Sequence, residues 1–134
     1  MKKLLLLSML LIVTQAHAVT TWTSSNCEAK GGITRTVGAQ TFCRSTSEMQ
    51  WWSAYSWCQA IGGKMPTMWE LCPNMSSLTQ GAYCSYPTNG AWSTTAYNTN
   101  RMWAITNNSV VDCGTTDKNL KKHVYCLPNG VAEN

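Results

Sequence analysis

The seven cysteines of this 134-residue chain constrain its fold more than any other feature. None belongs to a CxxC pair, and His123 is the only histidine after residue 18, so the pattern is not that of a zinc site. In an exported chain of this size, such a set is typical of a disulfide framework. Because seven is odd, at least one cysteine stays a thiol or bonds to another chain. The cysteines are Cys27, Cys43, Cys58, Cys72, Cys84, Cys113 and Cys126.

The first 18 residues have the three parts of a secretory signal peptide. Two lysines after the initiator methionine precede an apolar run over residues 4–13. Ala16 and Ala18 then place small residues at the positions that signal peptidase reads. The apolar run is shorter than the about 20 residues of a membrane-spanning helix, and no later stretch is apolar enough. The sequence therefore predicts cleavage after residue 18, a single domain over residues 19–134, and a location in the periplasm, at the cell surface or outside the cell.

Removal of this segment leaves little net charge. Two of the ten basic residues lie in it, so eight basic residues remain against six acidic ones, a net charge of +2. That balance gives no electrostatic support for a nucleic-acid partner. Serine, threonine, asparagine and glycine are abundant instead, so hydroxyl and amide groups are expected to solvate the surface.

The stretch over residues 45–72 predicts two helices joined by a glycine turn. Gly62 and Gly63 offer a residue for the left-handed conformation that ends a helix. Pro73 stops the second, shorter helix. The first helix is indicated by residues that share one face at spacings of three or four: Trp51, Ala54, Cys58 and Ile61.

Hydroxyl side chains in this stretch are placed to cap both helices. Thr67 and Glu70 have the spacing of a capping box at the start of the second helix. Two alternative pairs have the same spacing before the first helix: Ser45 with Glu48, and Ser47 with Gln50.

Strand patterns lie on both sides of this stretch. Residues 33–37 and 40–43 predict a hairpin, which brings the segments of Cys27 and Cys43 together. Helices early and antiparallel strands late predict an α+β domain. Further strands are expected over residues 92–97, 101–105, 109–113 and 123–127, while residues 19–32, 73–91 and 117–122 are expected to be irregular.

The order of these motifs resembles the C-type lectin-like domain. In that family a hairpin cysteine precedes a helix with the pattern Trp-x-x-Ala-x-x-x-Cys, a Gly-Gly turn and a second helix. A bacterial branch, found for example at the C-terminus of a collagen-like adhesin, adds Leu-Pro-Thr-x-x-Glu-Leu, a Trp-Ser-Ser/Thr-Thr strand and a closing Tyr-Val-x-Cys strand. The matching segments here are Phe42-Cys43, Trp51 with Ala54 and Cys58, Gly62-Gly63, Pro66-Thr67 with Glu70-Leu71, Trp92-Ser93-Thr94-Thr95 and Val124-Tyr125-Cys126.

The resemblance implies two helices packed on a small antiparallel sheet with long loops. It also implies two disulfides, Cys58–Cys126 and Cys27–Cys43. Of the other three cysteines, Cys72 and Cys84 are the favoured pair, and Cys84 with Cys113 is the alternative. In the favoured arrangement Cys113 stays a thiol or joins a second chain.

Departures from the family pattern bear on metal binding. Calcium-dependent lectins of the family bind sugar through a Glu-Pro-Asn or Gln-Pro-Asp triplet and a Trp-Asn-Asp motif. Here Cys72-Pro73-Asn74 lacks the leading carboxylate or amide, and nothing near Trp103 reads Trp-Asn-Asp. Residues 73–91 contain no Asp or Glu, whereas calcium takes about six to eight oxygen ligands. We therefore expect no metal and no other cofactor.

Loop side chains are the candidate ligand-binding groups. Tyr83, Tyr86 and Asn89 lie in the loop region where this fold keeps its binding surface, and tyrosines and amides suit adaptable polar recognition. Trp69 is a further candidate, because an exposed indole ring can stack on a ligand.

The remaining tryptophans and lysines have structural interpretations. Family core positions are expected for Trp51, Trp92 and Trp103, and partial exposure for Trp52 and Trp57. The lysines near the C-terminus are expected to form a solvated loop rather than a polysaccharide site: Lys118, Lys121 and Lys122.

Three classes of function follow from the sequence. The first is an exported, non-enzymatic binding or adhesion domain that recognises a glycan or surface protein through its loop face, without calcium. The second is a structural subunit of a cell-surface or periplasmic assembly, a homo- or hetero-oligomer joined through an exposed Cys113. An enzyme is disfavoured, because no acid–base pair, triad or metal cluster is evident and His123 is the only candidate base.

Overall fold

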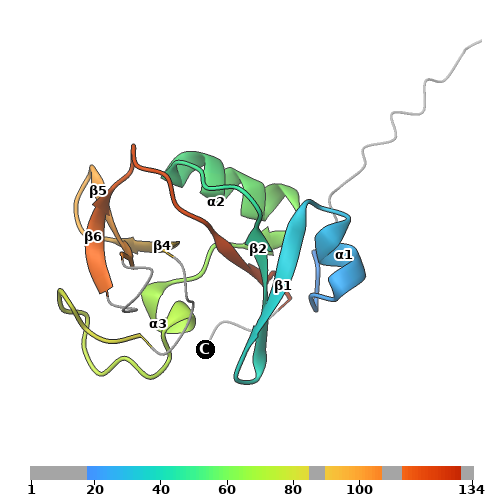
Figure 1. Cartoon of the computed structure of the whole chain (residues 1–134), viewed down its shortest axis with the longest axis horizontal. Coiled ribbons are helices and arrows are strands. Elements are labelled where there is room, and N and C mark those ends of the chain that lie inside the picture. The colour runs from blue at the N-terminus through green and yellow to red at the C-terminus, as the bar shows by residue number, and fades with distance from the viewer. Residues whose placement is uncertain (1–17, 85–89, 107–112, 131–134) are drawn as a thin grey trace, which may run out of the picture.

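The computed structural model describes residues 18–84, 90–106 and 113–130. Within these ranges the chain forms three helices and two small antiparallel sheets, so the predicted α+β class is confirmed (Figure 1). The expectation of two helices on one sheet is too simple. The elements are α1 (Ser24–Glu28), β1 (Gly32–Val37), β2 (Gln40–Ser45), α2 (Trp51–Ala60), β3 (Gly63–Lys64), α3 (Met68–Leu71), β4 (Ala91–Ala96), β5 (Arg101–Ile105), β6 (Cys113–Asp117) and β7 (Tyr125–Pro128).

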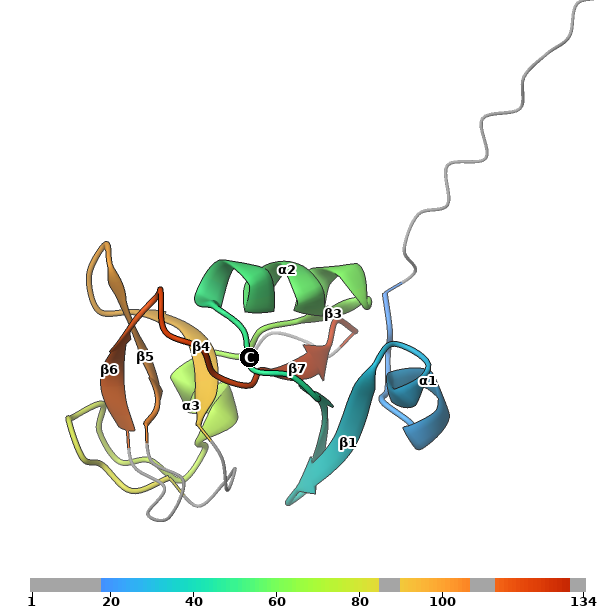
Figure 2. The ribbon, with the colours of Figure 1, turned by 45° about the horizontal axis from the view of Figure 1, so that its top comes forward.

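The two sheets lie side by side, with α2 across one side of the domain (Figure 2). The first sheet has the strand order β1-β2-β7-β3, and the second has the order β4-β5-β6. The last strand, β7, therefore lies between β2 and β3, with Cys126 opposite Cys43. This pairing brings the beginning and the end of the described chain into one sheet.

Helix α1 occupies a segment that was expected to be irregular. The Asn26 backbone N–H donates to Thr23 Oγ1 at 3.2 Å, and the Thr23 N–H donates to Asn26 Oδ1 at 2.8 Å. This capping box has Asn where the usual pattern has Glu or Gln, and the helix has only five residues, too few for a periodic signal. Cys27 is its buried residue and anchors it to β2 through a disulfide with Cys43.

The predicted capping boxes of α2 are wrong. The helix begins at Trp51 after the N-cap residue Gln50, and no side chain caps it. Ser45 is buried, where its Oγ donates to the Ser47 carbonyl at 2.8 Å and accepts the Val124 N–H at 3.1 Å. The tertiary structure holds the start of α2 instead, because the Trp51 N–H donates to the Lys118 carbonyl at 3.2 Å.

The turn and the second predicted helix form as expected. Gly62 has a φ of 88°, the left-handed conformation that glycine adopts without strain. Thr67 and Glu70 make both bonds of a capping box at the start of α3, at 3.1 Å and 3.0 Å. A short segment with local signals at both ends was therefore readable from sequence.

Strand β6 continues beyond residue 113, the predicted end of this strand. The expectation for residues 109–113 falls mostly outside the described residues, and the strand runs from Cys113 to Asp117. Arg101 on the neighbouring strand donates from Nε to Thr115 Oγ1 at 3.1 Å and from its guanidinium to the Thr115 carbonyl. The pairing partner thus decides the register, which a polar sequence of Gly, Thr and Asp does not reveal.

The core divides into two clusters. One contains Trp22, Trp51 and Trp92 under α2, and the other contains Phe42 and residues of α3 and β5. Trp22 anchors an otherwise polar segment in the core, since it is 3% exposed and donates from Nε1 to the Cys126 carbonyl at 2.9 Å. Trp103 was predicted to be core but is half-buried, with its ring edge-on to Tyr97 at 5.9 Å.

Three disulfides join these elements. The structure pairs the cysteines as the sequence favoured them: Cys27–Cys43, Cys58–Cys126 and Cys72–Cys84. The second bond joins α2 to β7 across a sequence separation of 68 residues. Cys113 takes part in none of the three bonds and is buried, with its Sγ 3.1 Å from Met75 Sδ.

Candidate functional site

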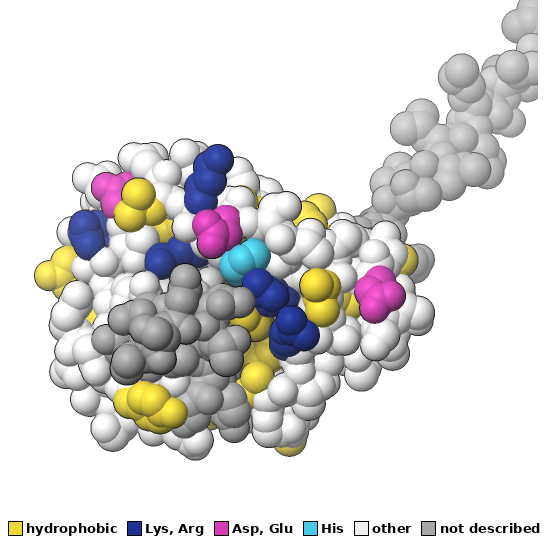
Figure 3. All heavy atoms as spheres, in the orientation of Figure 1, with side chains coloured by type: hydrophobic (Ala, Val, Ile, Leu, Met, Phe, Trp, Pro, Cys, Tyr) yellow, Lys and Arg dark blue, Asp and Glu magenta, His cyan; other side chains and the backbone are white. Residues whose placement is uncertain are grey.

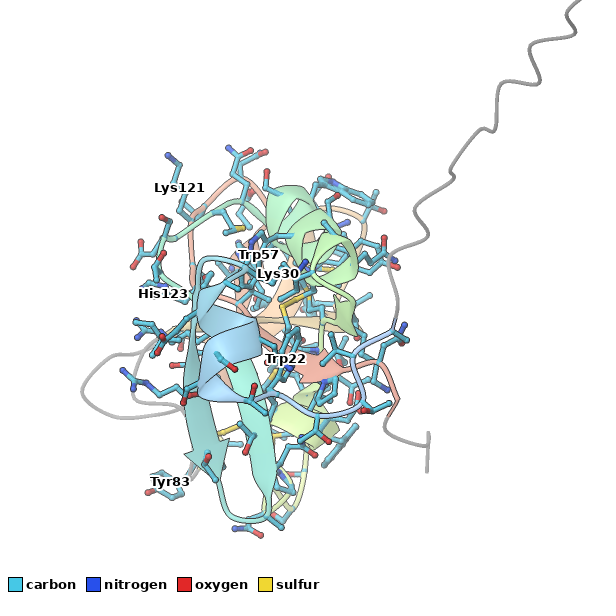
Figure 4. All side chains as sticks on the ribbon, turned by 90° about the vertical axis from the view of Figure 1, so that its right-hand side faces the viewer. Trp22, Lys30, Trp57, Tyr83, Lys121 and His123 are labelled. Atoms are coloured by element: carbon cyan, nitrogen blue, oxygen red, sulfur yellow. A yellow bond between two sulfur atoms is a disulfide. The ribbon has the colours of Figure 1, made fainter. Side chains whose placement is uncertain are left out.

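Two of the four residues predicted to bind a ligand are among the described residues: Trp69 on α3, and Tyr83. Tyr83 is 69% exposed and Trp69 is 47% exposed, so both rings are available to a partner. Figure 4 shows Tyr83 projecting from one end of the domain, away from Trp57 and α2. Tyr86 and Asn89 lie outside the described residues. A binding surface on the loop face therefore stays a prediction.

The structure places a cleft elsewhere, beside α2. Its volume is about 350 Å³, within the range of small-molecule sites. Figure 2 shows β3 beneath the C-terminal part of α2, which is where two of the contributing elements meet. Four separate parts of the chain line the cleft. Helix α2 contributes Tyr55 and Gln59, strand β3 contributes Gly63 and Lys64, and Met65 follows β3 directly. Thr94 comes from β4, and Asn129 follows β7.

Tyr55 is positioned by a second aromatic ring. Its ring stacks on Trp51 with centroids 5.3 Å apart and planes 18° apart. Trp51 is itself fixed, because its Nε1–H donates to the Ser93 carbonyl on β4 at 2.8 Å.

The Lys118 ammonium lies 5.1 Å from the Trp51 ring and 5.0 Å from the Trp52 ring. Lys118 therefore packs against aromatic side chains rather than extending freely into solvent.

The opposite wall of the cleft is held by α3 and β4. Lys64 Nζ lies 3.3 Å from Glu70 Oε2. The other oxygen of this carboxylate, Oε1, accepts the Thr67 N–H in the capping box of α3. The Thr94 N–H donates to the Pro66 carbonyl at 2.9 Å, and Thr95 Oγ1 accepts the Met68 N–H at 2.9 Å. These contacts fix the segment after β3 against β4, so the lining of the cleft is preformed.

The groups that line the cleft suit a hydroxyl-rich ligand. Gln59 and Asn129 supply amides that donate and accept, and Thr94 supplies a hydroxyl. Tyr55 supplies an apolar ring face, on which C–H groups of a sugar can pack. The charge of Lys64 is offset by Glu70, and the residues of this lining include no carboxylate and no histidine. The cleft therefore favours an uncharged polar ligand and offers no acid–base pair.

His123 lies on a different part of the surface. Its Nδ1 is 3.0 Å from the Ser45 carbonyl, and its Nε2 is 3.9 Å from Glu48 Oε1 (Figure 4). Burial and the nearby Arg44 guanidinium lower the pKa of His123 from its ordinary value of 6.5, against smaller raising effects of Ser45 and Glu48. This residue is therefore a neutral, structurally bonded histidine at pH 7 and lies outside the cleft.

Lys122 and the charged groups near it lie outside the cleft. Burial also lowers the pKa of Lys122, with Glu48 acting in the opposite direction. Figure 3 shows a face on which Lys or Arg, acidic and His side chains lie close together in a band, while few charged groups lie elsewhere on the coloured surface. Among the described residues, no three His, Cys, Asp or Glu side chains gather as metal ligands, and none of the described helices is long and apolar enough to span a membrane.

Cys113 does not have the exposure that the subunit hypothesis requires. The residue is 1% exposed, and its backbone bonds to the segment before Cys84 through Gly81 and Ala82, at 2.8 Å and 2.9 Å. A disulfide to another chain at this position would require that packing to open. The expectation of an exposed Cys113 is therefore wrong.

In comparisons with known proteins, no family model, no curated protein and no solved structure matches this chain.

Sequence reasoning did not find the cleft. A weak signal was present, since Trp51, Tyr55 and Gln59 follow one another at spacings of four and so share one side of a helix. Lys64, Thr94 and Asn129 gave no such signal. They meet the helix only because β3, β4 and the turn after β7 converge there.

Proposed function

We propose that this chain is an exported, non-enzymatic binding domain of C-type lectin-like type that recognises a glycan without calcium. The observation that carries the proposal is the preformed cleft at α2, lined by an aromatic ring, two amides, a hydroxyl and backbone atoms. The bond from α2 to β7, which the family resemblance implied, supports the lectin-like assignment. The three disulfides support folding in an oxidising compartment, as the predicted signal peptide requires.

An uncharged sugar fits the cleft better than an anionic one. Lys64 is the cation in the lining, and Glu70 lies 3.3 Å from it. An anionic ligand would compete with this carboxylate, whereas a neutral sugar leaves the ion pair intact. Ring stacking on Tyr55 and bonds to Gln59 and Asn129 would then supply most of the affinity. A protein ligand is less well supported, because a cleft of this size admits only a side chain or two.

The test begins with the mature protein on an array of glycans and surface proteins, with and without a chelator. We expect binding to neutral glycans that the chelator leaves unchanged. Each of Gln59→Ala and Asn129→Ala should weaken the affinity for the best glycan about fivefold, the equivalent of one hydrogen bond. Both side chains are exposed, so the variants should fold normally.

Tyr83→Ala is the matched control, because it removes an exposed group of the loop face far from the cleft. We expect it to bind as the unmodified protein does. Loss of binding in Tyr83→Ala with full binding in the cleft variants would move the site to the predicted loop face. Binding that the chelator abolishes would refute the calcium-free mechanism, and failure to bind any glycan would refute the proposed function.

A further inference from the structure

The segment after the predicted cleavage position is held by its backbone. The Val19 N–H donates to the Gly62 carbonyl at 2.9 Å, and the Gly130 N–H donates to the Val19 carbonyl at 3.1 Å. The Val19 side chain is half-buried against the cluster that contains Trp22, whereas Ala18 before it is exposed. Figure 4 shows this segment running beside β7 and the end of α2. Backbone hydrogen bonds on both sides thus hold the first residue of the predicted mature chain.

The carbonyl that Val19 contacts belongs to Gly62, the first residue after the C-cap of α2. Helix α2 ends at Ala60, Ile61 is its C-cap residue, and Gly62 follows directly. The end of a helix carries a partial negative charge of roughly half an elementary charge, and a cation placed there is stabilising. The last turn of α2 contains no basic side chain. The helix end therefore lacks a compensating charge from its own sequence.

No titratable side chain surrounds this position among the described elements that contact it. Residues 59–63 at the end of α2 and residues 128–130 after β7 contain none, and the cysteines nearby are in disulfides. Lys64, the next charged residue along the chain, pairs with Glu70. Glu133 follows in sequence, outside the described residues. A charge at the Val19 nitrogen would thus act on the helix end without a competing described group.

We propose that signal removal is a stabilising modification of this domain, because it creates a charged group at the end of α2. Hydrolysis of the Ala18–Val19 bond consumes one water and leaves a carboxylate on Ala18 and a protonated amine on Val19. The new α-ammonium group keeps the hydrogen bond to the Gly62 carbonyl and adds a positive charge, which the backbone amide lacks. Hydrogen bonds from charged donors are stronger than those from neutral donors. The mature domain is therefore more stable than the same domain with residues before Val19.

The test compares two proteins that differ at one end. One begins at Val19, and the other carries a Gly-Ser-Gly extension before it, which keeps the amide donor and moves the charge away. At about pH 6 and low salt, thermal unfolding of the first should occur roughly 2–4 °C higher. At about pH 9.5 the α-amino group loses its charge, since its ordinary pKa is about 7.7–8.0, and the difference in midpoint should vanish. Both proteins share every other titratable group, Glu133 included, so those groups cannot cause the difference. Equal midpoints at pH 6, or a difference that persists at pH 9.5, would overturn the proposal.

A lysine placed at either end of α2 provides a matched control. Ala60→Lys in the extended protein adds a cation at the exposed last residue of the helix and should recover at least part of the lost midpoint. Ser53→Lys adds the same exposed charge in the first turn and should recover none. Equal effects of the two lysines would show that this helix end does not respond to charge. N-terminal sequencing of the exported protein should begin at Val19, and a different first residue would also contradict the proposal.

Discussion

Loss of the disulfide between α2 and β7 should destabilise the domain more than loss of the loop disulfide. Cys58 and Cys126 are separated by 68 residues, whereas Cys72 and Cys84 are separated by 12. In the chain-entropy model, the longer closure removes about 4.4 kcal/mol of unfolded-state entropy and the shorter one about 2.8 kcal/mol. We therefore expect the double variant Cys58→Ala/Cys126→Ala to lose about 1.5 kcal/mol more than Cys72→Ala/Cys84→Ala.

The comparison is matched in its packing. All four cysteines are at most 1% exposed, so each double variant removes two fully buried sulfurs and leaves cavities of similar size. What differs between the two variants is the length of chain that each bond closes. The difference in the free energy of unfolding therefore reports the loop-closure effect, while the cavity contributions largely cancel.

Urea unfolding at equilibrium, followed by tryptophan fluorescence and circular dichroism, measures the two losses. Because small domains have only about 5–15 kcal/mol of stability, sucrose can be added equally to all samples if either variant unfolds without denaturant. The reasoning is refuted if the loop variant loses as much stability as the α2–β7 variant, or more. Mass spectrometry of each variant under non-reducing conditions checks that the remaining bonds are unchanged.

Three further predictions concern single residues. Thr67→Ala should lower the free energy of unfolding by about 1 kcal/mol, since it removes the α3 cap. Ser47→Ala should change it by less than about 0.5 kcal/mol, because no side chain caps α2. The urea midpoints of both variants test this, and equal losses would contradict it. Trp51→Phe should cost about 1–3 kcal/mol in the same assay, because the buried Ser93 carbonyl loses its donor, and an unchanged midpoint would be inconsistent with that bond. Because the pKa of His123 is lowered in the folded state, its contribution to stability is complete above pH 6.5 and is lost as the pH falls through the folded-state value; His123→Gln should flatten the profile between pH 7 and 5 compared with the unmodified protein, and an identical slope would count against this assignment.

Local signals in the sequence determined several features of the fold. The Thr67–Glu70 cap and the Gly62 turn were readable because each depends on residues a few positions apart. The hairpin of β1 and β2 was readable for the same reason, and it places Cys27 near Cys43. In the same way, the spacing of Trp51 and Cys58 showed the buried face of α2.

Predictions failed where a distant segment supplied the partner. Ser45 has the spacing of a helix cap, yet it bonds to Val124, because the chain near β7 folds back over it. Burial of Cys113 likewise follows from its contacts with Ala82 and Met75, which no local pattern shows.

The sequence by itself determined an α+β chain and a disulfide framework, and it predicts a signal for export. Only the tertiary structure formed the cleft proposed to bind a ligand, because it joins α2 and β3, which are neighbours in sequence, to β4 and the turn after β7, which are distant in sequence. The same holds for Val19. Its sequence context marks a cleavage position, but the helix end that would receive its charge lies more than 40 residues away along the chain. Local hydrogen bonding can be read from neighbours, whereas a site made of distant segments exists only after they pack.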